Sequence, residues 1–157
     1  MVDLDRKEVL RMLSYGVYVL TTKNKDNYSA ATITWVSQAS FEPPMLSVCL
    51  KRDSGPYSLV KERKEFILHM LCDDQKDFAS NFFTSTNVVD DELNGEKFEL
   101  IDDLPVLNAA PSYVRCSVLE VLEKGDHPLF LCLVKSVKLI NSVKPLELRQ
   151  TGWKYGG

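Results

Sequence analysis

The sequence has few cysteines, and their spacing is not that of a metal site or a disulfide framework. The four of them form no C-x-x-C pair. Three lie inside the apolar runs LSVCL, VRCSVL and FLCLV, where a thiol packs as a small hydrophobic side chain. We therefore expect no bound metal and no disulfide. The cysteines are Cys49, Cys72, Cys116 and Cys132.

Long apolar runs and an excess of positive charge are also absent. No stretch reaches the ~18 apolar residues that span a bilayer, and the first eight residues carry five charges, so we expect neither a membrane span nor a signal peptide. The 19 basic and 22 acidic residues leave a net charge of −3, which argues against binding to nucleic acid or a membrane surface. Residues 90–103 hold seven acids and one lysine, so the rest of the chain is net positive and is compatible with a small anionic ligand. A cytoplasmic protein is the expectation.

Glycine-rich phosphate loops are missing as well. Neither GxGxxG nor GxxxxGK occurs, and the strand–helix alternation of a doubly wound fold is not found. The 157 residues suffice for one domain, 1–157, with a core of its own. Aromatic and β-branched segments dominate, and the helical segments are short. We therefore predict a mainly β protein, an antiparallel barrel with a few short peripheral helices.

Apolar and alternating segments predict the strands, and capping residues predict the helices. Ser54-Gly55-Pro56 is typical of a helix start, with serine as N-cap and proline in the first turn. Asp74 is expected to cap a short helix in which Phe78 and Phe82 form an i,i+4 pair. Residues 84–112 are acidic and poorly periodic, which predicts a long loop with one or two short elements. The expected strands cover 15–22, 28–40, 45–51, 66–71 and a long hairpin over 113–140 that turns at Lys124-Gly125-Asp126, and a further helix covers 5–13.

Residues 29–58 are the most informative segment for chemistry. The predicted strand 28–40 mixes polar and apolar residues on both faces, which is unusual for a core strand. Two basic residues and a serine then precede the helix start, where free N–H groups and the helix dipole favour a phosphate. Flavin mononucleotide (FMN) offers a polar ring edge, an apolar end and a phosphate, but a Thr- and Ser-rich strand before an ordinary capped surface helix explains the same residues. The candidates are Thr32, Thr34, Trp35, Val36, Ser37, Gln38 and Ser40 for the ring and Lys51, Arg52 and Ser54 for the phosphate.

Four motifs in order along the chain point to one family. They are SYGVYVLTT, ATITWVSQASFEPPMLSVCLKRDSGPYSLVKERKEF, DDQKDFASNF and GDHPLFLCLV. With them the chain resembles the flavin reductase-like family, the FMN-binding split barrels that include flavoredoxins and the reductase components of two-component monooxygenases. The resemblance runs from about Ser14 to His127, which is most of the chain.

The resemblance implies a Greek-key split β-barrel that is usually a homodimer, with the flavin near the dimer interface. The ring would lie against Thr32–Gln38 and the phosphate against Lys51–Ser54. His127, which follows Gly-Asp, would be the catalytic residue on the nicotinamide side of the flavin, and a surface residue at a strand start is the alternative. His69 departs from the family, since FILHML stands where many relatives have asparagine in FxVNVL, and a structural role is favoured there.

Three aromatic residues are left open by the sequence. Trp35 either forms a wall of the flavin site or packs in the dimer. Trp153 and Tyr155 either close over a partner's site or are disordered with the terminal glycines.

The resemblance also implies an activity. It is that of an NAD(P)H-dependent flavin reductase, which transfers a hydride from NADH or NADPH to FMN and hands the electrons to a separate acceptor. A non-enzymatic FMN electron carrier is the alternative, and a module of this fold without flavin is a third. NAD(P)H oxidation with FMN present separates the first two, and the colour of the purified protein tests the third. The sequence leaves open the acceptor, the preferred nicotinamide and whether the flavin is a prosthetic group or a substrate.

Overall fold

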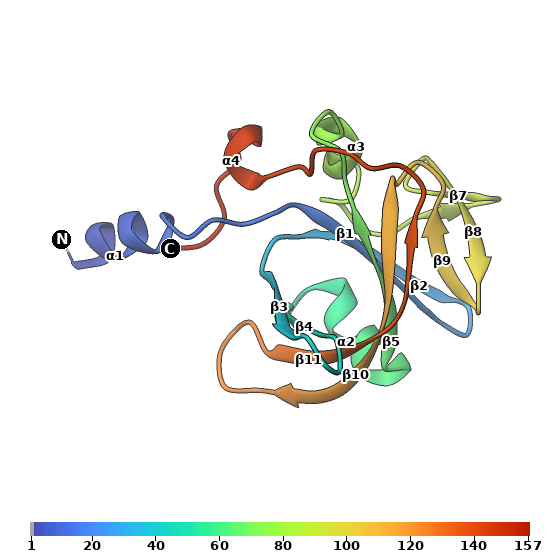
Figure 1. The fold of residues 1–157 in the computed structure, drawn as a ribbon, viewed down its shortest axis with the longest axis horizontal. Helices are drawn as coiled ribbons and strands as arrows, with labels where there is room; N and C mark the ends of the chain where they lie inside the picture. The colour runs from blue at the N-terminus through green and yellow to red at the C-terminus, as the bar shows by residue number, and fades with distance from the viewer. Residues whose placement is uncertain (1) are drawn as a thin grey trace.

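Seven antiparallel strands form the main sheet of the computed structural model, which describes residues 2–157 (Figure 1). Their order is β2-β1-β5-β10-β11-β4-β3. The sheet curls strongly, and its two edge strands, β2 and β3, are not paired with each other among the described residues, so the barrel is left open. The strands are β1 Tyr18–Asn24, β2 Asn27–Ile33, β3 Val36–Ser40, β4 Met45–Cys49, β5 Glu65–Met70, β10 Ser112–Leu122 and β11 Leu129–Leu139.

This architecture confirms the predicted mainly β, antiparallel class with few short helices. The long hairpin is also confirmed, because β10 pairs with β11 along nearly its whole length. The strands predicted at 45–51 and 66–71 correspond to β4 and β5. The helices are α1 Val2–Leu10, α2 Gly55–Arg63, α3 Lys76–Ser80 and α4 Leu148–Thr151.

The predicted strand 28–40 is two strands, which corrects the sequence interpretation. The chain leaves the β conformation at Thr34 and Trp35. Before this break, β2 pairs with β1, and after it, β3 pairs with β4 at the opposite edge of the sheet. Because a break allows the two halves to present different faces to the core, no single alternation describes the segment. The mixed polarity of the segment therefore follows from the break between its two strands.

The segment 84–112 is expected to be a long loop with one or two short elements, but residues 88–107 form a second sheet of four short strands. Its strands, in the order β6-β7-β8-β9, are joined by tight turns. Positive φ at Asp90, Asn94, Gly95, Asp102 and Asp103 makes these turns, and Asp, Asn and Gly tolerate that conformation best. The acidic residues thus mark turns between very short strands. The strands are β6 Val88–Val89, β7 Glu92–Leu93, β8 Glu96–Ile101 and β9 Leu104–Leu107.

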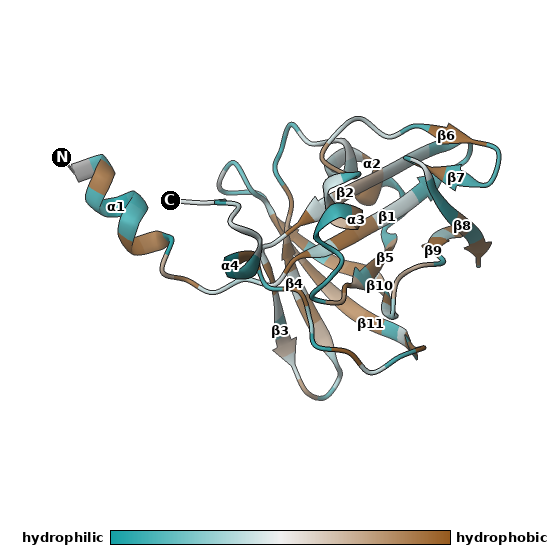
Figure 2. Cartoon of the chain, turned by 90° about the horizontal axis from the view of Figure 1, so that it is seen from above, coloured by the Kyte–Doolittle hydropathy of each residue, from teal (hydrophilic) through white to brown (hydrophobic). Residues whose placement is uncertain are grey.

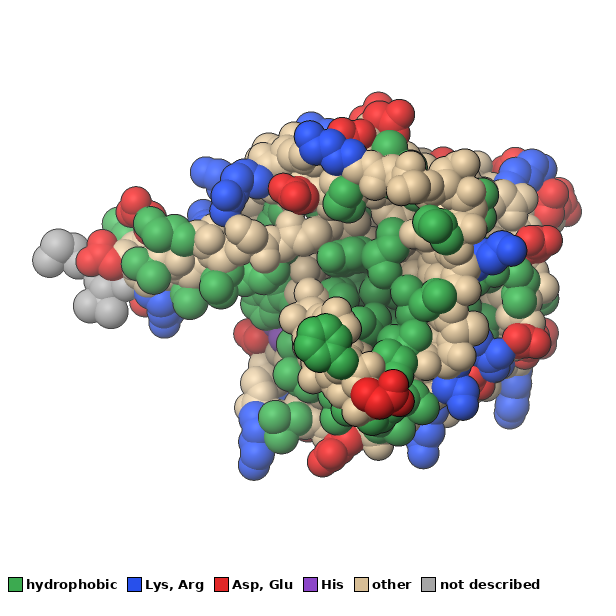
Figure 3. All heavy atoms as spheres, viewed as in Figure 1, with side chains coloured by type: hydrophobic (Ala, Val, Ile, Leu, Met, Phe, Trp, Pro, Cys, Tyr) green, Lys and Arg blue, Asp and Glu red, His purple; other side chains and the backbone are tan. Residues whose placement is uncertain are grey.

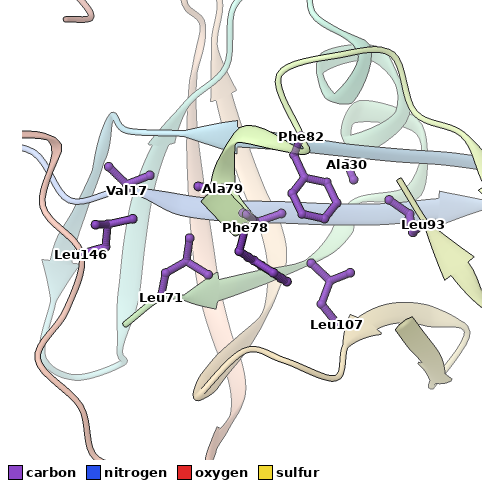
Figure 4. Close-up of a cluster of buried hydrophobic side chains, with 10 residues drawn as sticks. Val17, Ala30, Leu71, Phe78, Ala79, Phe82, Leu93, Leu107 and Leu146 are labelled. Atoms are coloured by element: carbon purple, nitrogen blue, oxygen red, sulfur yellow. The ribbon is translucent and has the colours of Figure 1, made fainter. Parts of the chain in front are cut away.

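Buried side chains form a core on each side of the main sheet. Inside the curl, Val60 of α2 packs with side chains of β1, β4, β5, β10 and β11. Outside it, α3 and the small sheet cover β1 and β5 (Figure 4). The expected Phe78–Phe82 pair lies in this outer core with ring centroids 5.5 Å apart. Gln75, and not Asp74, is the residue before α3.

The N-terminal helix stands apart from this body. In two views α1 projects away from the sheets, and the C-terminus lies beside it (Figures 1 and 2). The helix ends at Leu10 and begins ahead of the predicted start at residue 5, so Asp3 and Asp5 lie in its first turn. None of the helices described is long and apolar enough to cross a membrane.

Candidate functional site

A cavity of about 530 Å³ lies where the main sheet is split. The break between β2 and β3 forms one wall, and the end of β4 with the first turn of α2 forms a second. The hairpin residue His127 and the C-terminal segment after α4 complete it. Elements distant in sequence therefore meet at this one place.

The β2–β3 break supplies hydrogen-bonding groups without partners. Thr34 Oγ1 and Trp35 Nε1 are buried and have no hydrogen-bond partner in the described structure. Both residues line the cavity. A buried polar atom left unpaired costs roughly 1–3 kcal/mol, so these two atoms point to a ligand that supplies the missing partners. Thr32 differs, because its hydroxyl already donates to the Ala79 carbonyl at 2.6 Å.

The start of α2 supplies the positive side of the cavity. Lys51 and Ser54 both line it, and the Lys51 ammonium lies 3.6 Å from the exposed Asp53 carboxylate. Ser54 occupies the N-cap position as predicted, yet its hydroxyl donates to the Lys51 carbonyl at 2.6 Å and does not cap the helix. The helix start therefore lacks a side-chain cap, and its dipole favours an anion there.

A third unpaired group lies at the same helix start. The buried Ser29 hydroxyl has no hydrogen-bond partner in the part of the chain described. It lies 3.2 Å from the point where a Cβ on Gly55 would stand, so a side chain at Gly55 would crowd it. Ser29 was not predicted as a site residue, because it looks like any other small residue of an alternating strand.

His127 faces the cavity between three partners. Its Nδ1 donates to Asp126 Oδ1 at 2.8 Å, and its Nε2 accepts from the Tyr155 hydroxyl at 2.6 Å. The imidazole also packs against Trp35, with ring centroids 4.3 Å apart. The hydrogen bond from His127 lowers the pKa of the Asp126 carboxyl.

The C-terminal segment forms a wall of the cavity, a role that the sequence did not decide. Trp153, Lys154 and Tyr155 line it. Trp153 packs edge-on against Phe83 at 4.7 Å between centroids, and Tyr155 packs against Trp35 at 5.4 Å. Burial is the main cause of the raised pKa of Tyr155. Trp35 is therefore covered by its own chain.

Five predicted residues lie outside the cavity lining, among them Ser40 at the end of β3. Val36, Ser37 and Gln38 follow the break on edge strand β3, where Ser37 and Gln38 are exposed. The Arg52 side chain turns away to the β10–β11 hairpin, where it donates to the Gly125 carbonyl at 3.0 Å. The structure thus brings together Thr32, Thr34, Trp35, Lys51, Ser54 and His127.

Several lining residues were missed by the sequence analysis. Phe82 and Phe83 reach the cavity from the turn after α3, and Cys49 reaches it from the end of β4. Burial raises the pKa of the Cys49 thiol. The only signal for Cys49 was its place two residues before Lys51 in a strand.

His69 is a structural residue outside the cavity. It is fully buried on β5, and its Nδ1 donates to the Val19 carbonyl at 2.9 Å. Its Nε2 accepts from the Leu107 amide at 3.0 Å, which ties β9 to the main sheet. Burial lowers the pKa of this imidazole to about 4, so it is neutral at pH 7.

The chain is similar to several known proteins. Residues 10–156 match a family model described as a flavin reductase like domain. FMN reductase (NADH) RutF of Acinetobacter baylyi is 30% identical over 126 residues, which cover 80% of this chain and 67% of that protein. The NADH:FMN oxidoreductase of Rhodococcus qingshengii is 30% identical over 135 residues, which cover 85% of this chain and 69% of that protein.

Longer relatives and solved structures extend the comparison. Diflavin flavoprotein A 1 of Synechocystis is 29% identical over 131 residues, but the chain spans only 22–25% of the length of the diflavin flavoproteins of Nostoc that it matches. The styrene monooxygenase flavin reductase of Pseudomonas putida S12 has a TM-score of 0.79 at 23% identity, covering 98% of this chain and 96% of that chain. An FMN-binding protein of Thermus thermophilus has a TM-score of 0.72 at 22% identity, covering 82% of this chain and 72% of that chain. At these identities the structures establish the fold alone.

Proposed function

The chain belongs to the flavin reductase-like domain family, and from that premise we propose that it is an NADH- or NADPH-dependent FMN reductase. Residues 1–157 would form one FMN-binding domain, and reduced flavin would serve a separate acceptor. Two relatives of similar extent are named as FMN reductases that use NADH, which supports the proposal. The preferred nicotinamide is left to the experiment.

The observation that carries the proposal is the set of unpaired polar atoms around the cavity. Thr34 Oγ1 and Trp35 Nε1 are buried donors without partners at the β2–β3 break. The polar edge of a flavin ring carries several hydrogen-bond acceptors, so these donors fit it. Phe82 and Phe83 offer the apolar surface that the rest of such a ring needs.

The side of the cavity formed by Lys51 and the start of α2 fits a phosphate. Lys51 contributes a positive charge, and the uncapped start of α2 contributes its dipole. The unpaired Ser29 hydroxyl lies beside that helix start. We therefore assign the FMN phosphate to Lys51 and to Ser54, whose hydroxyl would exchange its bond to the Lys51 carbonyl for the phosphate, and the ring to Thr34 and Trp35.

FMN, when bound, supplies the redox chemistry, since it accepts a hydride and passes on the electrons. The chain holds and orients the reactants. Trp35, Trp153 and Tyr155 exclude water from the cavity. His127 is held by Asp126 and Tyr155 in the tautomer whose Nε2 accepts a hydrogen bond. When a nicotinamide replaces Tyr155 at His127, that nitrogen can accept a hydrogen bond from the nicotinamide amide.

An anaerobic spectral titration tests the function. The protein is loaded with FMN, freed of excess flavin and titrated with NADH and then NADPH. We expect flavin absorbance bands that bleach with the preferred nicotinamide. Bands that persist with both would favour the electron carrier, and a protein that gains no bands with FMN would contradict the proposal.

We further propose that the protein is a homodimer. Trp35 does not supply the support, because Tyr155 of the C-terminal segment packs against it. The support comes from α1, a nine-residue helix whose neighbourhood exposes Leu4, Met12 and Leu13 at 71%, 66% and 57%. Hydrophobic side chains are visible along this projection (Figure 3). A helix this short is marginal in water by itself, so a second copy would stabilise it.

A cytoplasmic location is part of the same proposal. All four cysteines are free thiols, and reducing compartments keep thiols in that state. Cys116 and Cys132 are fully buried, and burial raises the pKa of both thiols, which protects them from oxidation. The described structure brings Cys72 close to Asp73 and Asp74, and exposed acidic groups of this kind are common in proteins without a bound ion.

A further inference from the structure

The turn that carries His127 is not stabilised by strand pairing of its own. Strand β10 ends at Leu122 and β11 begins at Leu129. The intervening residues 123–128 are bend and coil. A connection of six residues without strand pairing is mobile unless other elements hold it. The position of His127 over the cavity therefore depends on contacts from outside the hairpin.

Beside the Leu50 N–H, which donates to the Pro128 carbonyl at 3.1 Å, Arg52 provides several contacts of this kind. Its backbone N–H donates to the Asp126 carbonyl at 2.8 Å. Its guanidinium donates from Nη2 to the Gly125 carbonyl at 3.0 Å, with the Glu123 carbonyl at 3.5 Å. Three carbonyls of the turn are thus gathered around one residue, and the nearest of them belongs to the residue just before His127.

The Arg52 side chain is itself held in place from α2. Its Nη1 lies 3.4 Å from the Tyr57 hydroxyl, and the guanidinium carbon lies 5.8 Å from the centroid of that ring. Tyr57 and Lys61 in turn bond the Glu123 carboxylate, Lys61 at 2.7 Å. The side chain is absent from the cavity lining, whereas its neighbour Lys51 is part of it. The adjacent side chains of Lys51 and Arg52 therefore have different surroundings, since Lys51 lines the cavity and Arg52 contacts the hairpin turn and Tyr57.

We propose that Arg52 is a positioning residue, which fixes the hairpin turn and so places the His127 ring over the cavity, and that it is not a phosphate anchor. This rests on the proposed function in one respect, namely that His127 meets the nicotinamide. The planar guanidinium suits the task, because it can donate to two carbonyls at once in a fixed geometry. A lysine keeps the charge but loses that geometry.

The two roles predict opposite results for Arg52→Lys. A phosphate anchor acts mainly through charge, so lysine would restore FMN binding that Arg52→Ala had lost. A positioning residue acts through the planar geometry of its guanidinium. Neither lysine nor alanine has this geometry, so both substitutions would leave the turn free to move. Lys51→Ala is the contrasting variant, because Lys51 lines the cavity, to which the proposed function assigns the phosphate.

The experiment combines NMR on flavin-free protein with binding and kinetics. The chain has two histidines, so ¹⁵N–¹H spectra of the imidazole rings report His127 and, as an internal check of the fold, His69. For Arg52→Ala and Arg52→Lys we expect shifted His127 signals and unchanged His69 signals. Their ratio of FMN to riboflavin affinity stays within about twofold of the parent, while the apparent KM for NADH rises about fivefold or more, as mispositioning predicts.

Two results would overturn the inference. One is an unmoved His127 ring in both variants. The other is a loss of FMN affinity in Arg52→Ala, with riboflavin affinity unchanged, that Arg52→Lys restores. Lys51→Ala is expected to lose FMN affinity selectively in this way. Failure of the proposed function would look different. The parent protein would then bind no FMN or leave NADH unoxidised, while the His127 ring signals would still shift in the Arg52 variants.

Discussion

The two histidines of the chain differ in their surroundings, and this decides what each can do. The His69 ring is buried and bonded on both nitrogens to backbone groups. The His127 ring is bonded to two side chains, one of them the 91% exposed Asp126. A ring held by backbone contributes to folding, and a ring held by movable side chains at a cavity can exchange its partners for a ligand.

His69 makes stability depend on pH. Its pKa is about 4 in the folded protein and ~6.5 in an unfolded chain, so the unfolded state binds more protons between these values. The stabilisation is therefore complete above pH ~6.5 and is lost as pH falls toward 4, by up to ~1.4 kcal/mol per pH unit. Urea unfolding at pH 7.5 and 5.0 should show ~2 kcal/mol more loss for the parent than for His69→Gln. Equal losses would contradict this origin.

His127→Ala should affect the nicotinamide and spare the flavin. The imidazole offers Nε2 to a ligand at the cavity, so its removal should raise the apparent KM for NADH about tenfold, the worth of one hydrogen bond. Steady-state kinetics with a separate FMN titration measures both. Unchanged kinetics would make His127 a structural residue and leave nicotinamide binding to other groups.

At the scale of elements, the start of α2 and the C-terminal segment form two walls of one cavity. The helix start is a charged wall, because Lys51 stands beside a helix end without a side-chain cap. The C-terminal segment is an aromatic wall, in which Trp153 and Tyr155 pack on Phe83 and Trp35. The charged wall should determine whether FMN or riboflavin binds more tightly, and the aromatic wall should determine how slowly the flavin dissociates.

Lys51→Ala should weaken FMN and leave riboflavin unaffected. A charge-assisted contact with a phosphate is worth roughly 1.5–3 kcal/mol, so the Kd for FMN should rise at least about tenfold. Quenching of flavin fluorescence gives both constants. Ser54→Ala is the companion variant, and it should lose the bond to the Lys51 carbonyl and not the ~1 kcal/mol of a helix cap, since its hydroxyl makes no cap. Equal weakening of the two flavins would move the phosphate elsewhere.

Ending the chain at Gly152 should speed the release of flavin. The change removes Trp153, Lys154 and Tyr155 from the cavity wall, and a less enclosed ligand keeps fewer contacts. We expect FMN to dissociate about tenfold faster in stopped-flow dilution. Tyr155→Phe is the control, because it loses the hydroxyl at His127 but keeps the wall. Release at the parental rate would show that the segment does not cover the flavin.

At the scale of the whole molecule, one apolar surface has no cover in the described structure. A groove of about 1080 Å³ runs between α1 and the C-terminal segment, and Leu4, Leu13, Tyr15, Leu148 and Trp153 are among its lining residues. The tail links its two sides, since Arg11 donates to the Gly156 carbonyl at 3.0 Å. Anything that packs in this groove therefore also contacts the segment that closes the cavity.

A dimer that buries this groove should come apart when α1 is made polar. Sedimentation of the parent at micromolar concentration should give twice the chain mass of 17.8 kDa. The double variant Leu4→Asp, Leu13→Asp should shift it toward monomer, because charges would enter an apolar interface. Val137→Asp, which changes an exposed residue of β11, is a control for charge alone. A monomeric parent would contradict the dimer.

The sequence by itself determined the fold class, the helix start at Ser54 and the long hairpin. These depend on local chemistry, since apolar runs, a proline in the first turn and a Gly-containing turn act over a few residues. It also placed Thr34, Trp35, Lys51 and His127 in one site through motifs of the family.

Only the tertiary structure decided which side chains of those segments reach the cavity. The break at Thr34 and Trp35 depends on β2 and β3 pairing at opposite edges of one curled sheet, and that choice lies outside the segment itself. For the same reason Arg52 faces the hairpin while Lys51 faces the cavity. A sequence orders residues along one line, whereas the direction of each side chain depends on partners that folding brings from far along the chain.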